Sequence, residues 1–200
     1  MKDFLKIALN MTAIFVCAGI ILSLVFVKTA PVIRATMEKE KEQALKSLMP
    51  EASSITAGGT WEPVPGKEGE YYAVKDKSGL LGYEVTTWSK GYSSFINILV
   101  GLNKDMSVRA IEILGHAETP GLGDEIEQPY FKGRFKGKRL DQLEVVKNPD
   151  PNAIEAISGA TISSRAVAKG VRDAVKFMME KYGVSNSPAE RRTGQKEAHE

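Results

Sequence analysis

An uncharged apolar run from Ile7 to Val27 is the feature of this sequence that most limits how the chain can fold. A helix rises 1.5 Å per residue, so the run reaches roughly 30 Å, the thickness of the hydrocarbon core of a bilayer. Its polar members, Asn10, Thr12 and Ser23, carry no charge. The run therefore predicts one transmembrane helix over residues 7–27 in a lipid bilayer, preceded by a short segment of residues 1–6.

A cleaved signal peptide is the alternative, because it also begins with basic residues and continues with apolar ones. The apolar part of a signal peptide has roughly 7–15 residues, which is shorter than this run. The nearest small-residue cleavage point, at Ala30, is followed directly by Pro31. We therefore expect an uncleaved anchor. Basic residues flank the run on both sides, so charge alone does not fix its orientation.

The residues after the membrane run divide into a stalk, a domain and a tail. Oppositely charged side chains three or four positions apart predict a helical stalk over residues 28–50, which ends at Pro50. Residues 51–183 are the candidate domain, and the glycines and prolines of 51–70 predict a loop-rich beginning. Residues 184–200 are charged and poor in apolar side chains, which predicts a disordered tail.

The domain begins with strand patterns and ends with a helical one. The expected strands are 71–75, 80–88, 95–102, 106–114 and 143–147. The third and fourth are joined by Asn103-Lys104-Asp105, which is typical of a hairpin. Helical spacing covers 162–182, with Gly183 placed to end the helix. Together these patterns predict a small α+β domain behind a single N-terminal transmembrane helix.

Charge and cysteine content exclude several classes of function. The chain has 27 Lys and Arg against 25 Asp and Glu, so its charge gives no reason to expect nucleic-acid binding. Its one cysteine, Cys17, cannot form an internal disulfide or a cysteine-based zinc or iron–sulfur site. Any redox chemistry must therefore come from an organic cofactor or from partner proteins.

The segment Ser158-Gly159-Ala160-Thr161 stands directly before the predicted C-terminal helix. Thr161 is placed to be the N-cap, where free N–H groups and the helix dipole favour a phosphate. Ser163, Ser164 and Arg165 would add donors near that phosphate. An unmodified cap behind a glycine turn explains the same residues, and local chemistry alone favours it. A phosphate loop of the Walker type is excluded, since no Gly-Lys-Ser/Thr follows.

Two other segments are candidates for a ligand site. Residues 116–123 have the sequence His-Ala-Glu-Thr-Pro-Gly-Leu-Gly and follow a predicted strand, where loops often carry function. The His-x-Glu pattern also occurs in zinc deaminases, but the Pro-Cys-x-x-Cys that these require is absent. Alone, the segment is a turn with a histidine. In Gly91-Tyr92-Ser93-Ser94, the tyrosine is suited either to stacking on a planar ligand or to packing in the core.

Taken together and in this order behind one membrane helix, the three segments resemble the FMN-binding domain family. Within it, the resemblance is closest to the G subunit of Rnf electron transport complexes, and the sister group is the C subunit of the sodium-pumping NADH:quinone oxidoreductase. It covers nearly the whole chain before the tail and is strongest over residues 83–182. A length of 200 residues favours the Rnf group, because the quinone-oxidoreductase group is usually longer.

The resemblance implies FMN joined by a phosphoester to Thr161, installed by a separate flavin transferase that uses FAD and magnesium. It implies no catalytic residue and no metal site in this chain itself. The residues that it places around the flavin are His116, Glu118, Thr119, Gly121, Leu122, Ser158, Gly159, Ala160, Ile162 and Ser163.

The sequence departs from the family pattern in two places. Glu155 stands six residues before the threonine, where the family usually has Asp within the transferase recognition motif. A carboxylate is kept there, but it is one methylene longer. Ser93-Ser94 stands where the family often has Gly-Gly.

The resemblance also implies a place in the cell and in a complex. The chain would be a single-pass protein of the cytoplasmic membrane, with its flavin domain on the outer side. It would pass electrons within an ion-translocating ferredoxin:NAD oxidoreductase, beside membrane, iron–sulfur and flavin subunits. The alternatives are the C subunit of the quinone reductase, a stand-alone exported flavin carrier, or a membrane-tethered adaptor without a cofactor.

Overall fold

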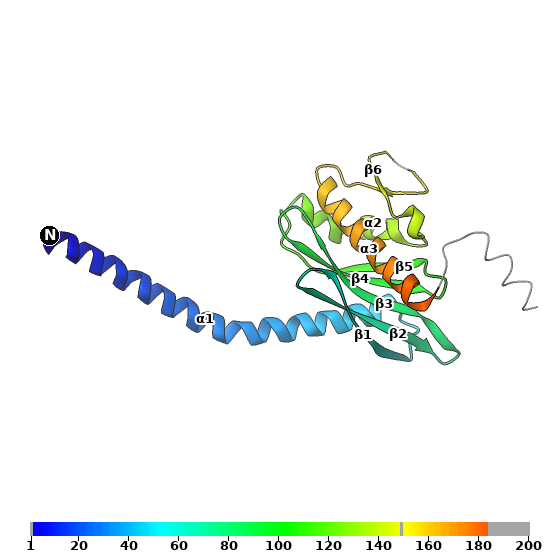
Figure 1. Ribbon diagram of the computed structural model, residues 1–200, viewed down its shortest axis with the longest axis horizontal. Helices are drawn as coiled ribbons and strands as arrows, with labels where there is room; N and C mark the ends of the chain where they lie inside the picture. Colours follow the sequence, from blue (N-terminus) through cyan, green and yellow to red (C-terminus); the bar gives the residue numbers. More distant parts are fainter. Residues whose placement is uncertain (1, 149, 184–200) are drawn as a thin grey trace, which may run out of the picture. The chain divides into compact units, whose positions relative to one another are not determined.

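The computed structural model describes residues 2–148 and 150–183 and confirms an α+β fold (Figure 1). The predicted tail, 184–200, lies outside the described residues. In chain order the elements are α1 (Lys2–Leu48), β1 (Ser54–Val64), β2 (Lys67–Asp76), β3 (Gly79–Lys90), β4 (Phe95–Asn103), β5 (Val108–Gly115), the 3-10 helix η1 (Gly123–Glu127), α2 (Pro129–Lys132), the 3-10 helices η2 (Gly133–Phe135) and η3 (Leu140–Gln142), β6 (Val145–Val146), β7 (Ile154–Glu155) and α3 (Thr161–Tyr182).

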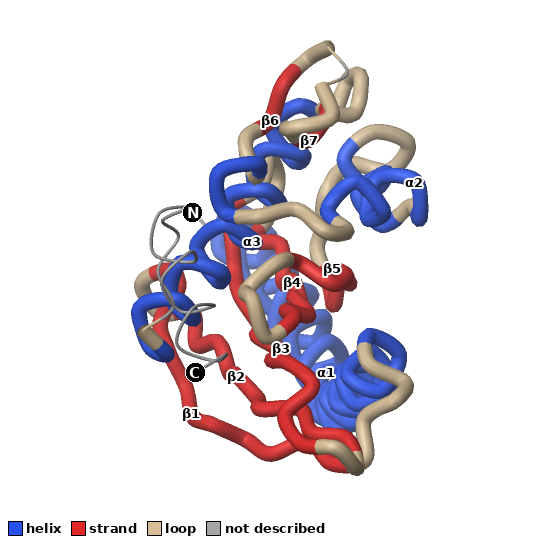
Figure 2. Tube along the Cα trace, turned by 90° about the vertical axis from the view of Figure 1, so that its right-hand side faces the viewer, coloured by secondary structure: helices blue, strands red, loops and turns tan. Residues whose placement is uncertain are grey.

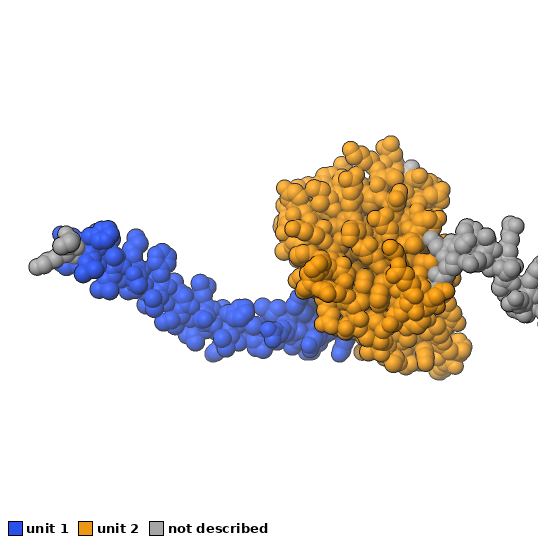
Figure 3. All heavy atoms as spheres, viewed as in Figure 1, with its two compact units in different colours: residues 1–42 blue, residues 43–200 orange. Residues whose placement is uncertain are grey.

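Two compact units, residues 1–42 and 43–200, make up the chain (Figure 3). The first unit is the greater part of α1, which continues through Pro31 and ends just before Pro50. Within the described residues, α1 is the one helix long and apolar enough to cross a membrane. Its large apolar side chains between Phe4 and Val27 are more than half exposed, so this surface suits contact with lipid.

The second unit is built on an antiparallel sheet in which the strands follow chain order, β1-β2-β3-β4-β5. The predicted hairpin is present as β4 and β5, where Val100 lies opposite Ile111. Side chains alternate between the two faces of a strand. Ile98 and Val100 of β4 therefore join one buried cluster, whereas Leu99 between them joins another. The sheet is thus covered by apolar residues on both faces.

Helix α3 covers one face of the sheet and lies against β3 and β4 (Figure 2). The predicted apolar face is confirmed: five of its residues are at most 1% exposed, namely Val167, Val171, Ala174, Val175 and Met178. Gly183 ends the helix in the left-handed conformation, with φ of 65°, and its N–H reaches the carbonyl of Met179. Glycine tolerates this conformation without strain.

The last turns of α1 cover the opposite face. Leu45, Leu48 and Met49 are buried there against Val74 and Leu99. The domain core therefore begins at Gln43 rather than at the first strand.

One loop prediction is wrong, because residues 54–64 form strand β1 at the edge of the sheet. Gly58 and Gly59 are needed there by the packing of Tyr71, since a Cβ added to Gly58 would lie 2.2 Å from the Tyr71 ring. The glycine-rich sequence thus marks a close approach of backbone and side chain within a strand rather than a loop.

The pairing of β6 with β7 was not predicted, because two paired residues are too few to give a periodic pattern in the sequence.

Candidate functional site

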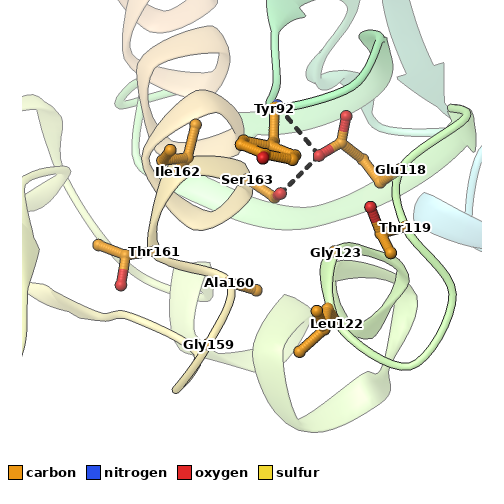
Figure 4. Close-up of a pocket in the computed structure, with 10 residues that line it drawn as sticks. All are labelled: Tyr92, Glu118, Thr119, Leu122, Gly123, Gly159, Ala160, Thr161, Ile162 and Ser163. Atoms are coloured by element: carbon orange, nitrogen blue, oxygen red, sulfur yellow. Dashed lines mark hydrogen bonds between the residues drawn. The ribbon is translucent and has the colours of Figure 1, made fainter.

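Three segments that are far apart in the sequence line one cavity of about 440 Å³ (Figure 4). They are the β3–β4 loop, the loop that follows β5, and the beginning of α3. The lining residues are Tyr92, Glu118, Thr119, Leu122, Gly123, Gly159, Ala160, Thr161, Ile162 and Ser163. The structure thus brings together the three segments that sequence analysis singled out.

Glu118 ties the three segments to one another. Its Oε1 accepts hydrogen bonds from the backbone N–H groups of Ser93 and Ser94, both at 3.0 Å. Its Oε2 accepts from the N–H of Tyr92 at 3.0 Å and from the hydroxyl of Ser163 at 2.6 Å. Glu118 is only 5% exposed, so these bonds are shielded from water. The carboxylate therefore fixes the shape of the cavity.

The pKa of Glu118 lies below its ordinary value. Burial alone would raise the pKa, but the hydrogen bonds from Ser163 and from three backbone N–H groups favour the charged form more strongly. The resulting stabilisation is fully present above the pKa of glutamate in the unfolded chain. It is lost as the pH falls through the lowered pKa of the folded state. Glu118 is therefore a charged group at neutral pH.

Replacing Glu118 by glutamine is expected to lower the free energy of unfolding by at least about 2 kcal/mol at pH 7, because charge-assisted hydrogen bonds are lost and an amide N–H₂ now faces N–H donors. Urea unfolding followed by tryptophan fluorescence measures the change. Glu68→Gln, at an exposed position, is the matched control and should unfold like the wild type. Equal stability of the Glu118 and Glu68 variants would contradict the assigned role.

His116 does not line the cavity. Its Nδ1 accepts a hydrogen bond of 3.0 Å from the N–H of Glu118, and its Nε2 lies 2.8 Å from Oε1 of Glu127. The imidazole is 8% exposed and holds the turn that presents Glu118. Its contacts are those of a residue that supports the loop.

Thr161 is not the N-cap of α3, contrary to the sequence prediction. Ala160 occupies that position, and no side chain among the described residues caps the first turn. The hydroxyl of Ser164 instead accepts from the N–H of Ile157 and donates to the carbonyl of Ala160. Because those bonds close the preceding turn, the helix includes Thr161 as its first residue. The N–H groups of the first turn remain open to a ligand.

Thr161 stands at the boundary between the cavity and a second hollow of about 740 Å³. Its side chain is turned away from Tyr92 and Glu118 (Figure 4). Gly159 also lines both spaces. Of the predicted site residues, Gly121, Glu155 and Ser158 line the second hollow only.

The prediction of side-chain donors around a phosphate on Thr161 is wrong for Ser163, Ser164 and Arg165. The hydroxyls of Ser163 and Ser164 are already bound to Glu118 and to the backbone. Arg165 lines a different hollow, beside Glu144 and Lys169. The cations that share a hollow with Thr161 are Arg134 and Lys147, which come from η2 and from the segment after β6.

Tyr92 and Gly123 line the cavity although they were not among the predicted pocket residues. Tyr92 is 69% exposed, so it is not a core residue, which decides between the two roles considered for it. A Cβ added to Gly123 would lie 2.8 Å from Cβ of Glu118, so glycine is needed for the close approach. The sequence signal for both residues is their position within a candidate segment, 91–94 for Tyr92 and 116–123 for Gly123.

Comparison with known proteins finds all three segments within the match to one domain family. Residues 91–176 match the model of the FMN-binding domain family. The chain is 35% identical over 176 residues to the G subunit of the proton-translocating ferredoxin:NAD(+) oxidoreductase complex of Clostridium ljungdahlii, covering 88% of this chain and 91% of that one. It is 31% identical over 192 residues to the G subunit of the ion-translocating oxidoreductase complex of Methanosarcina acetivorans, covering 91% and 98%.

Solved structures share the fold. The C subunit of the Na(+)-translocating NADH-quinone reductase of Parabacteroides distasonis superimposes with a TM-score of 0.52 at 20% identity, over 68% of this chain and 80% of that one. The shared fold, the match to the FMN-binding domain and the near-complete coverage of the two relatives all point to the same family. The chain belongs to the family of G subunits of ion-translocating (Rnf) oxidoreductase complexes, whose FMN-binding domain it carries.

Proposed function

We propose that this chain carries FMN covalently on Thr161 and passes electrons within an ion-translocating ferredoxin:NAD(+) oxidoreductase complex. The relatives are subunits of such complexes, and the matched domain is an FMN-binding one. The chain acts as an electron-transfer subunit of that oxidoreductase, with no catalytic residue of its own. When bound, FMN supplies the redox chemistry, and the protein binds and orients it.

The cavity fits a flavin ring. Its volume of about 440 Å³ is in the ordinary range for ligand sites. Three side chains at its wall are apolar and exposed: Tyr92 at 69%, Leu122 at 48% and Ile162 at 54%. Exposed apolar groups that converge from three segments are unusual without a ligand or partner, because burying them is favourable. They would hold the isoalloxazine ring of the flavin.

A single observation carries the attachment at Thr161: the residue lies where the apolar cavity meets the second hollow, at an uncapped helix start. Gly159 has φ of 80°, and a Cβ placed there would lie 3.2 Å from Leu122. Glycine therefore leaves space beside Thr161 for the chain that links phosphate and ring. The donor would be FAD, used with magnesium by a separate flavin transferase that recognises the region of Glu155 and Ser158–Thr161.

A covalent link suits a membrane-anchored domain on the outer side of the cytoplasmic membrane, where free flavin would diffuse away. We place the span at 7–27, the stalk at 28–50 and the FMN-binding domain at 51–183. The apolar surface of α1 supports an anchor. The outer location rests on the family resemblance.

The test is to express the full chain with and without a flavin transferase and to examine it after denaturation in SDS. We expect a fluorescent band only with the transferase, and flavin absorbance bands in the folded protein. The transferase must be shown to be active on an acceptor protein of known flavinylation in the same cells. A colourless, non-fluorescent chain beside such a working control would contradict the proposal.

A further inference from the structure

The second hollow next to Thr161 has a polar lining that the flavin ring does not explain. Its side chains include two cations, Arg134 and Lys147, and two carboxylates, Glu125 and Glu155. A phosphate joined to both Thr161 and the ribityl chain is a diester and carries one negative charge. A cation in the second hollow could bind this negative charge, because Thr161 lines that hollow and its side chain is turned away from Tyr92 and Glu118.

Arg134 is held firmly at this place. Its Nη1 donates to the carbonyl of Glu155 at 2.5 Å, and its Nη2 lies 3.4 Å from Oε2 of the same residue. The guanidinium also lies over two aromatic rings, 5.4 Å from the centre of Tyr130 and 5.9 Å from that of Phe131. Its side chain is 25% exposed, so the group is partly shielded.

The guanidinium keeps donors for an anion. Arginine has five N–H donors in a planar fork that matches phosphate oxygens. In the described part of the chain, its side chain donates one hydrogen bond, to the carbonyl of Glu155. A cation that is already fixed in place loses little side-chain entropy when it binds a further group.

The hollow holds two cations and two carboxylates, and the partners of these four groups decide which cation is available to a further anion. Glu155 faces Arg134, and Glu125 accepts a hydrogen bond of 3.0 Å from the hydroxyl of Tyr130. Lys147 makes no hydrogen bond or ion pair with any residue that the structure describes. Neither carboxylate is paired with Lys147, so a phosphate there could accept from this ammonium group and from the unused N–H groups of Arg134.

We propose that Arg134, positioned by Glu155 and assisted by Lys147, binds the phosphate of the flavin that Thr161 carries. The inference rests on the proposed function. It gives Glu155 a role besides recognition by a transferase, because its backbone carbonyl and carboxylate both hold the guanidinium. The Glu155 carboxylate, one methylene further out than the Asp usual in the family, lies 3.4 Å from Nη2 of Arg134.

Free flavins test the proposal without flavin transfer. The full-length chain in detergent, produced without a transferase, is titrated with FMN and with riboflavin, which lacks the phosphate. We expect FMN to bind more tightly, and Arg134→Met to weaken FMN binding roughly tenfold with riboflavin unchanged. Arg134→Lys should recover part of the FMN affinity, because a point charge replaces the fork.

Arg165→Met is the matched control, because Arg165 lies in a different hollow and has the same formal charge. It should leave the binding of both flavins as in the wild type. If FMN and riboflavin bind the wild type equally, or if Arg134→Met and Arg165→Met weaken FMN alike, the proposal is overturned. Equal weakening of both flavins by Arg134→Met would also overturn it, since it shows a folding effect.

A second measurement uses the flavinylated protein. The ³¹P resonance of the diester should shift in Arg134→Met and stay in place in Arg165→Met. An unshifted resonance in Arg134→Met overturns the proposal even where free flavins bind too weakly to measure. A chain that binds free FMN through Arg134 but never becomes flavinylated would contradict the covalent attachment alone, so the two failures are distinguishable.

Discussion

Replacing Thr161 by alanine is expected to leave a folded protein that carries no covalent flavin. Alanine removes the hydroxyl that would form the ester, and it is a strong helix former at the first position of α3. Within the described residues, the Thr161 hydroxyl makes no hydrogen bond, so its loss should change the free energy of unfolding by less than about 0.5 kcal/mol. In-gel fluorescence and the intact mass of the protein, both after expression with a transferase, measure the result.

Two variants control this experiment. Thr161→Ser keeps a hydroxyl at the same place and should retain covalent flavin. Thr119→Ala removes another hydroxyl from the cavity wall and should also retain it. A fluorescent Thr161→Ala band would assign the attachment to another residue. Loss of flavin in Thr119→Ala as well would show that cavity shape, rather than the ester oxygen, was changed.

Glu84 is expected to make the stability of the domain depend strongly on pH. It lies between Tyr83 and Val85, which face α3, so its own side chain faces the last turns of α1. It is fully buried, and neither carboxyl oxygen has a hydrogen-bond partner among the described residues. Burial raises the pKa of Glu84 to about 8, although the charge of Arg109 lowers it.

Because the folded state binds the proton more tightly than the unfolded chain, Glu84 favours folding most at low pH. That contribution is fully present below the pKa of an unfolded glutamate and is lost as the pH rises through about 8. By pH 7 the loss amounts to roughly 3 kcal/mol, from 1.36 kcal/mol per pKa unit. Glu84→Gln is neutral at every pH and should remove this dependence.

Thermal unfolding of both proteins between pH 5 and pH 9 tests the prediction. The glutamine variant should exceed the wild type in stability at pH 7 and 9, and the gap should close towards pH 5. Glu62→Gln, at an exposed position, should follow the wild-type profile. A constant gap across the pH range would show that Glu84 does not titrate with a raised pKa.

Much of the fold follows from local sequence patterns. The uncharged run of 7–27, the spacing of Val167 and Val171 in α3, and the turn between β4 and β5 are repeating or local features. Each is decided by neighbouring residues, so no knowledge of the rest of the chain is needed. Strand β1 was missed because its glycines are required by the ring of Tyr71, which lies on the next strand.

The candidate site, like the fold, could be predicted from the sequence only in part. The family resemblance that the motifs carry selects Thr161 and Glu118 as residues of one pocket. The motifs give no sign that Glu118 holds the backbone of Tyr92, Ser93 and Ser94, more than twenty residues earlier in the chain. They place Arg165 beside the phosphate, whereas the arginine that shares a hollow with Thr161 is Arg134.

The long apolar helix and the α+β class could be predicted from composition and short-range spacing, and the segments that form the site from the family resemblance that their motifs carry. Which charged side chains meet depends on the packing of distant segments. Arg165 lines a different hollow from Thr161 although it lies only four residues further along α3, and Arg134 comes from a distant turn. Contacts between distant residues follow from the packing of the sheet, α3 and the short helices, and that packing leaves no pattern in the order of residues along the chain.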